Sequence, residues 1–123
     1  MEHPKISLVH EDSRGRMYSI ALPNGRELML LYSEKGSLRG GHSHSVNESV
    51  MVLTGKMLYH KGANDTKEML FAGDSSSNGP GEVHMGEFLE NTWLIESKDA
   101  KIGEWKQENW EPMRAKVRAN AAR

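Results

Sequence analysis

The feature that most constrains the fold is a series of short apolar segments that recur at intervals of about ten residues. Turn-forming sequences such as Pro23-Asn24-Gly25 and Gly79-Pro80-Gly81 separate them. Short segments joined by Gly- and Asn-containing turns are typical of antiparallel strands linked by hairpins. We therefore predict an all-β fold, either a sandwich or a barrel. The expected strands are Ile6–Val9, Met17–Leu22, Glu27–Tyr32, Glu48–Leu53, Lys56–Lys61, Glu68–Phe71, Gly86–Leu89 and Thr92–Glu96.

The C-terminal segment has a different pattern, which predicts one α-helix over about residues 109–121. Asn109 can cap such a helix, and Pro112 is tolerated in its first turn. Trp110, Met113 and Val117 recur at helical spacing, so one face can dock on a sheet or cover a dimer interface. A chain of 123 residues has room for one domain, with a barrel over about residues 17–97.

Composition excludes several classes of protein. Sixteen basic and seventeen acidic residues give a net charge of −1, so nothing favours a nucleic-acid partner. The longest apolar run, Leu28–Tyr32, is too short to cross a bilayer, and no membrane association is expected. The start of the chain has no basic region followed by an apolar stretch, so we expect a cytoplasmic protein. Without cysteine, the available chemistry is that of histidine, carboxylate and hydroxyl groups.

The spacing of the histidines indicates a metal site. His42 and His44 are separated by one residue, which puts them on one face of a strand, roughly 6.5–7 Å apart. Glu48 follows after a short bend, and the Pro80-Gly81 turn can aim His84 inward. Three imidazoles and one carboxylate suit a single divalent transition metal, with Mn, Fe, Co, Ni and Zn all acceptable, and leave positions for substrate or water.

At these residues the sequence resembles the cupin superfamily. The first cupin motif, G-x5-H-x-H-x3-E-x6-G, is matched in full by Gly36, His42, His44, Glu48 and Gly55. The second, G-x5-P-x-G-x2-H-x3-N, is matched in part by Gly73, Gly81 and His84. It departs from the pattern at Gly79 and Phe88.

The resemblance implies a small β-barrel, or double-stranded β-helix of the jelly-roll type, with a metal inside one end. By similarity, the metal ligands would be His42, His44, Glu48 and His84. The segment Leu38–His44 is also similar to the histidine-bearing strand of nucleotide-sugar cupins, in which a histidine acts as general base and no metal is required.

Several other residues are candidates for the pocket. Arg39 could bind a carboxylate or phosphate, although regular alternation would point it away from the face of His42 unless Gly40 and Gly41 change the parity. Tyr59, Met85, Phe88 and Trp93 are candidate pocket walls. The polar segment Ser75–Ser77 would either bring hydroxyls to the pocket or form a solvated edge strand. His60, just before a turn, is expected to be exposed.

These observations favour a small metal-binding cupin that is an enzyme acting on a small polar molecule, either a sugar or an organic acid. The alternatives are a metal-independent nucleotide-sugar isomerase or epimerase, with His42 or His44 as base, and a non-catalytic domain that binds a small molecule. We expect a homodimer, because the second face of several strands, such as Glu48–Leu53, is also apolar.

Overall fold

The computed structural model describes residues 3–121, which form two antiparallel sheets and a C-terminal helix. The all-β prediction is confirmed. The elements are β1 (Lys5–Asp12), β2 (Gly15–Ala21), β3 (Arg26–Ser33), β4 (Leu38–His44), β5 (Glu48–Thr54), β6 (Lys56–Lys61), β7 (Thr66–Phe71), β8 (Ser75–Asn78), β9 (His84–Phe88), β10 (Thr92–Lys101), β11 (Gln107–Asn109) and α1 (Glu111–Ala121).

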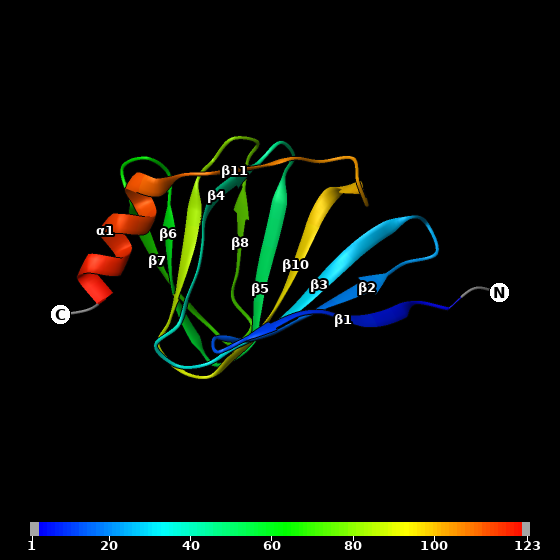
Figure 1. The fold of residues 1–123 in the computed structure, drawn as a ribbon, viewed down its shortest axis with the longest axis horizontal. Helices are drawn as coiled ribbons and strands as arrows, with labels where there is room; N and C mark the ends of the chain where they lie inside the picture. Colours follow the sequence, from blue (N-terminus) through cyan, green and yellow to red (C-terminus); the bar gives the residue numbers. More distant parts are fainter. Residues whose placement is uncertain (1–2, 122–123) are drawn as a thin grey trace.

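The two sheets face each other as the layers of a jelly roll (Figure 1). One has the strand order β1-β2-β3-β10-β5-β8, and the other has the order β11-β4-β9-β6-β7. Strands far apart in the chain are neighbours, because β10 lies between β3 and β5 while β9 lies between β4 and β6. This connectivity brings the two sequence motifs to one place.

The core lies between the sheets and follows from alternation along the strands. In β5, Val50 and Val52 point inward and are buried, whereas Met51 and Leu53 point outward and are each 42% exposed. Leu31 and Leu94 complete the inner face of this sheet from β3 and β10. The opposite sheet contributes the buried residues Met57, Tyr59, Leu70 and Phe88.

Helix α1 packs on the outer face of the second sheet, at the opposite end of the molecule from β1 (Figure 1). Met113 and Val117 are buried against Met85, as the helical spacing predicts, while Trp110 remains 41% exposed. The short strand β11, which precedes the helix, was not expected from the sequence. Within residues 3–121, no helix has the length and apolar character to cross a membrane.

The expectation that His60 is exposed is wrong, since its side chain is only 2% exposed. His60 pairs across strands with Met85, so both side chains lie on the outer sheet face that α1 covers. Its ring nitrogens contact two carboxylates, Nδ1 at 2.7 Å from Asp65 and Nε2 at 3.3 Å from Glu87. The turn that seemed to leave His60 at the surface instead supplies Asp65 as a partner.

Candidate metal centre

Three histidines converge between the sheets at one end of the sandwich. His42 and His44 come from β4, and the strand register places His84 of β9 directly opposite His42. The ring centroids lie 4.7 Å apart for His42 and His44, 4.9 Å for His42 and His84, and 5.1 Å for His44 and His84. One nitrogen of each ring lies within 4.8 Å of the others, which is close enough to bind a single ion.

A β-bulge in β4 sets which residues share the face of these histidines. The pairing with β9 shifts between Gly40 and His42, so one extra residue is inserted there. Gly40 and Gly41 have φ values of +101° and +77°, a left-handed region that favours glycine. The inserted residue reverses the inward–outward alternation of side chains along β4. Arg39 therefore lies on the same inner face as His42, although regular alternation would put them on opposite faces.

Glu48 approaches the histidines from the opposite sheet. One carboxylate oxygen lies 3.4 Å from Nδ1 of His44, and the other lies 3.2 Å from Nε2 of His84. Lys98 on the neighbouring strand β10 places its Nζ 3.3 Å from the carboxylate. Glu48 is 1% exposed, so its charge is held in the interior by groups from three strands.

The polar atoms that face one another here are buried but make no hydrogen bonds to the protein. They are Nδ1 of His44, Nε2 of His84 and both carboxylate oxygens of Glu48. The other nitrogen of His84, Nδ1, lies 3.0 Å from the carbonyl oxygen of Glu82. A carbonyl only accepts, so Nδ1 carries the hydrogen and Nε2 of the neutral ring presents a lone pair.

This donor set fits a divalent transition metal. Buried imidazole nitrogens and carboxylate oxygens without hydrogen bonds are costly unless another group binds them, and a metal ion is the group that accepts all of these donors. The carbonyl of Glu82 fixes the ring of His84 as outer partners of metal ligands commonly do. His42, His44 and His84 would hold the ion. Glu48, the fourth ligand implied by the resemblance, is outside this group of three but lies beside it, 3.2 Å from Nε2 of His84.

The electrostatics keep two of the histidines neutral. Burial, reinforced by the neighbouring histidines, lowers the pKa of His42 to about 3, and burial lowers the pKa of His44 to about 4. For Glu48, burial opposes ionisation, but contact with His84 and the charge of Lys98 outweigh it and lower its pKa to about 2. For His84, burial is outweighed by Glu48, which raises its pKa.

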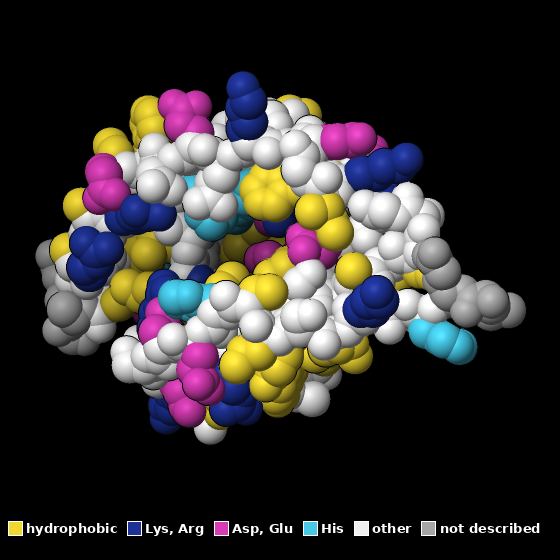
Figure 2. Space-filling model, turned by 45° about the vertical axis from the view of Figure 1, so that its right-hand side comes forward, with side chains coloured by type: hydrophobic (Ala, Val, Ile, Leu, Met, Phe, Trp, Pro, Cys, Tyr) yellow, Lys and Arg dark blue, Asp and Glu magenta, His cyan; other side chains and the backbone are white. Residues whose placement is uncertain are grey.

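The histidines line a cavity of about 980 Å³ between the sheets, which opens to the surface as a hollow with histidine side chains on its wall (Figure 2). Of the candidate pocket residues, Arg39, Tyr59 and Phe88 line this cavity between the sheets. Met85 also belongs to the lining, but its side chain is buried on the outer sheet face against Met113 and Val117. Trp93 differs from the expectation and lies outside the lining. Leu94 and Glu96 take the inward positions of β10, so the side chain of Trp93 packs on the other face against two tyrosines, Tyr18 and Tyr32.

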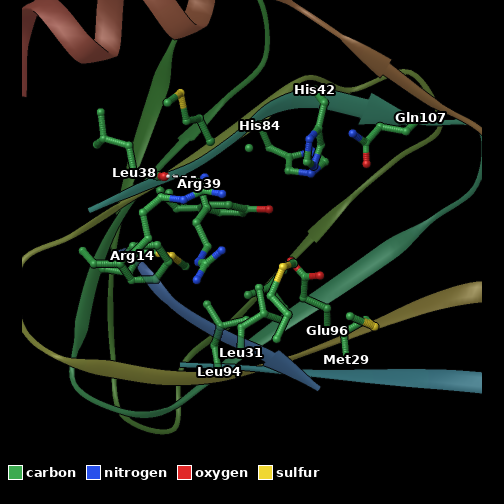
Figure 3. A pocket seen from close by; sticks show the side chains of 18 of the residues that line it. Arg14, Met29, Leu31, Leu38, Arg39, His42, His84, Leu94, Glu96 and Gln107 are labelled. Atoms are coloured by element: carbon green, nitrogen blue, oxygen red, sulfur yellow. Dashed lines mark hydrogen bonds between the residues drawn. The ribbon is translucent and has the colours of Figure 1, made fainter. Parts of the chain in front are cut away.

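Sequence reasoning missed several titratable groups of the cavity lining, among them Lys98 and Glu96 (Figure 3 labels Glu96). Burial, together with repulsion from Glu48, raises the pKa of Glu96 to about 7. Glu96 therefore exchanges its proton near neutral pH, which is the property required of a general acid or base. Alternation with the apolar residue Leu94 could have indicated that Glu96 and Lys98 face inward.

The serine segment of β8 is an edge strand of the larger sheet, paired only with β5 among residues 3–121. Ser75 and Ser77 are exposed, while Ser76 is buried and its hydroxyl contacts Lys61 and Glu68. Within the described chain, none of these three serines lines the cavity. The structure therefore favours the edge-strand interpretation.

No protein-family model matches this sequence, and a search of curated proteins also finds no match. Solved structures do match. A capsular polysaccharide assembling protein, CapF from Staphylococcus aureus, has a TM-score of 0.66 and 18% identity over 89% of this chain and 32% of its own. KdgF from Halomonas sp. has a TM-score of 0.65 and 14% identity over 78% of this chain and 88% of its own. Hydroxypropylphosphonic acid epoxidase from S. wedmorenis has a TM-score of 0.63 and 13% identity over 76% and 55%, respectively.

These similarities show the fold. The chain has the double-stranded β-helix, or jelly-roll, fold of these proteins, which is the fold that the resemblance of the motifs to cupins implies. It spans about a third of the length of CapF, with 32% of that chain covered, so the likeness to CapF concerns one part of a larger protein. Because one fold hosts many activities, the function has to be argued from the residues of the cavity.

Proposed function

We propose that this protein is a metal-dependent enzyme that acts on a small polar molecule inside the barrel. The observation that carries the proposal is the convergence of His42, His44 and His84 in a cavity, with Glu48 beside them. The orphaned atoms His44 Nδ1, His84 Nε2 and the two Glu48 oxygens support it. A bound divalent metal would supply Lewis-acid chemistry, polarising a substrate oxygen or a water.

The chain's own residues would assist this chemistry in separate ways. Glu48, ionised and held by Lys98, offsets the positive charge of an ion between the sheets. Glu96 can hold or release a proton at its carboxyl group at neutral pH. The apolar walls, including Leu31 and Phe88, limit the access of water to the reacting groups.

A second candidate is a metal-independent sugar enzyme in which His42 or His44 is the general base. Both rings are neutral at pH 7, so each retains a nitrogen able to accept a proton, but their low pKa values make them weak bases. The similarity to a capsular polysaccharide assembling protein is compatible with such a role. The two candidates differ in whether function survives removal of metal.

Elemental analysis after loading with divalent metals tests the first candidate. Wild-type protein should retain about one equivalent, and His84→Ala should retain less than about a tenth of that. His10→Ala is the matched control, because His10 is exposed and contacts only Asp12. If the wild type retains no metal after loading and still binds a nucleotide sugar in the presence of chelator, the second candidate replaces the first.

A further inference from the structure

Four arginines line the cavity, Arg14, Arg39, Arg114 and Arg118, and they differ in how their charges are balanced. Arg114 pairs with Glu111 at 3.0 Å, and Arg118 is exposed. Arg14 lies 2.7 Å from the carboxylate of Asp12, which neutralises it. Arg39 is only 9% exposed, yet within residues 3–121 no carboxylate lies within 4.0 Å of its guanidinium. Burial, followed by repulsion from Arg14, lowers the pKa of Arg39, and the smaller attractions of Asp12 and Glu96 only partly oppose this. A nearly buried cation beside a like charge is unfavourable unless an anion accompanies it.

The guanidinium of Arg39 is nevertheless held in a defined position. Its Nε donates to the hydroxyl of the fully buried Ser33 at 2.7 Å, and Nη2 donates to the carbonyl of Tyr32 at 3.3 Å. Among the described residues, Nη1 has no hydrogen-bond acceptor. The protein therefore orients a planar donor group at the cavity and leaves donor capacity for a ligand.

We propose that Arg39 is the anchor for a carboxylate group of the substrate, which is a small organic acid lying between Arg39 and the three histidines. This inference rests on the proposed function and names its substrate class. The β-bulge at Gly40 and Gly41 serves this arrangement, because it places Arg39 and His42 in the same cavity (Figure 3). A guanidinium matches the planar geometry of a carboxylate.

The lining offers apolar surface for the carbon skeleton of an organic acid. Met29, Leu31 and Leu94 project into the cavity near Arg39 and Glu96 (Figure 3). These apolar side chains can contact the carbon skeleton of an acid, while Lys98 and Gln107 add polar groups to the same lining. The carboxylate of such an acid would lie at Arg39, and a second oxygen-containing group of the same molecule would lie at the three histidines.

The test measures binding of oxalate, malonate, succinate and glutarate by calorimetry, with succinamide as a neutral analogue and inorganic phosphate as a separate arm. At least one dicarboxylate should bind the metal-loaded wild type, and succinamide should not. Arg39→Gln should weaken that binding roughly tenfold or more while metal content is unchanged. Arg16→Gln is the matched control, because Arg16 stacks over Tyr32 and Trp93 and does not line the cavity.

Repeating the titration in chelator separates this inference from the proposed function. Binding that depends on Arg39 with and without metal supports the anion anchor even if the metal enzyme is wrong. If Arg39→Gln loads metal and binds dicarboxylates as tightly as the wild type, the anchor is overturned while the proposed function stands. No dicarboxylate binding to wild type, or tighter binding of phosphate than of any dicarboxylate, also overturns it. If Arg39→Gln does not fold, Arg39→Lys, which lacks the planar fork, should weaken binding about threefold.

Discussion

Two clusters of buried histidine lie on opposite faces of the same sheet. On the inner face, His42, His44 and His84 converge between the two layers of the sandwich. On the outer face, His60 lies beneath α1 with Asp65 and Glu87. His44, His84 and His60 are buried and His42 is half-buried, so burial does not distinguish the two clusters.

The difference lies in the partners of the ring nitrogens. Each nitrogen of His60 contacts a carboxylate oxygen, at 2.7 Å to Asp65 and 3.3 Å to Glu87. In the inner cluster, Nδ1 of His44 and Nε2 of His84 face other polar groups without forming hydrogen bonds. The outer cluster pairs both nitrogens of its histidine with carboxylates, and Oδ2 of Asp65, which makes no hydrogen bond, lies 3.5 Å from Lys116 of α1. The inner cluster leaves nitrogens of two histidines and both oxygens of Glu48 without hydrogen bonds, available to bind another group.

The largest expected effect is on stability in the outer cluster. His60→Ala leaves Asp65 and Glu87 without their buried partner and opens a gap below α1, so it should lower the free energy of unfolding by about 3 kcal/mol. Urea denaturation followed by circular dichroism measures this change. The folded protein should still load metal like the wild type, and a loss of metal would show that the two clusters are not independent.

The second prediction concerns Glu96 in the inner cavity, whose protonation makes the stability of the protein depend on pH. The pKa of Glu96 is raised from 4.5 to about 7, so the folded protein binds its proton more tightly than the unfolded chain does. That carboxyl therefore destabilises the protein increasingly as pH rises from 4.5 to 7. Glu96→Gln removes the penalty, and between pH 5 and pH 8 its stability relative to the wild type should rise by on the order of 2 kcal/mol.

Thermal or urea unfolding of both proteins at the two pH values checks this sign. Ser97→Ala, which changes an adjacent residue outside the cavity lining, is the control and should show no such pH-dependent difference. A stability difference between Glu96→Gln and the wild type that is the same at pH 5 and pH 8 would contradict the assigned environment of Glu96.

The smallest effect is expected at the rim of the outer cluster. Lys116 of α1 lies 3.5 Å from Asp65, but its side chain is 57% exposed. Because exposed ion pairs contribute little, Lys116→Ala should change the free energy of unfolding by less than about 0.5 kcal/mol. A loss comparable to that of His60→Ala would mean that the lysine, rather than the histidine, stabilises this cluster.

Much of the fold follows from local signals in the sequence. The turns and alternating strands predict the sandwich, and the spacing of Trp110, Met113 and Val117 predicts a docked helix. The helix begins at Glu111 because Gln107–Asn109 pairs instead with β4 as a short strand. Because β4 is far away in the chain, no local sequence pattern predicts this pairing.

The cavity is predicted less completely, for a similar reason. The histidine spacing gave a candidate metal site, but the placement of Arg39 depends on a bulge whose extra residue reverses the alternation. Trp93, a candidate pocket wall, packs outside the cavity, and Glu96 was overlooked, because pairing with β3 and β5 sets which side chains of β10 point inward. His60 was misjudged because Asp65 in the following turn and Glu87 of β9, which is remote in sequence, enclose its ring.

The central claim is that the inner cluster, and not the outer one, binds a metal. Anomalous diffraction from crystals grown with cobalt tests it most directly, because the method locates the ion itself. We predict a single strong peak at about 2.1 Å from Nε2 of His84, with His42 and His44 as further ligands. A peak at His60 and Asp65 instead, or no peak between β4 and β9, would contradict the account.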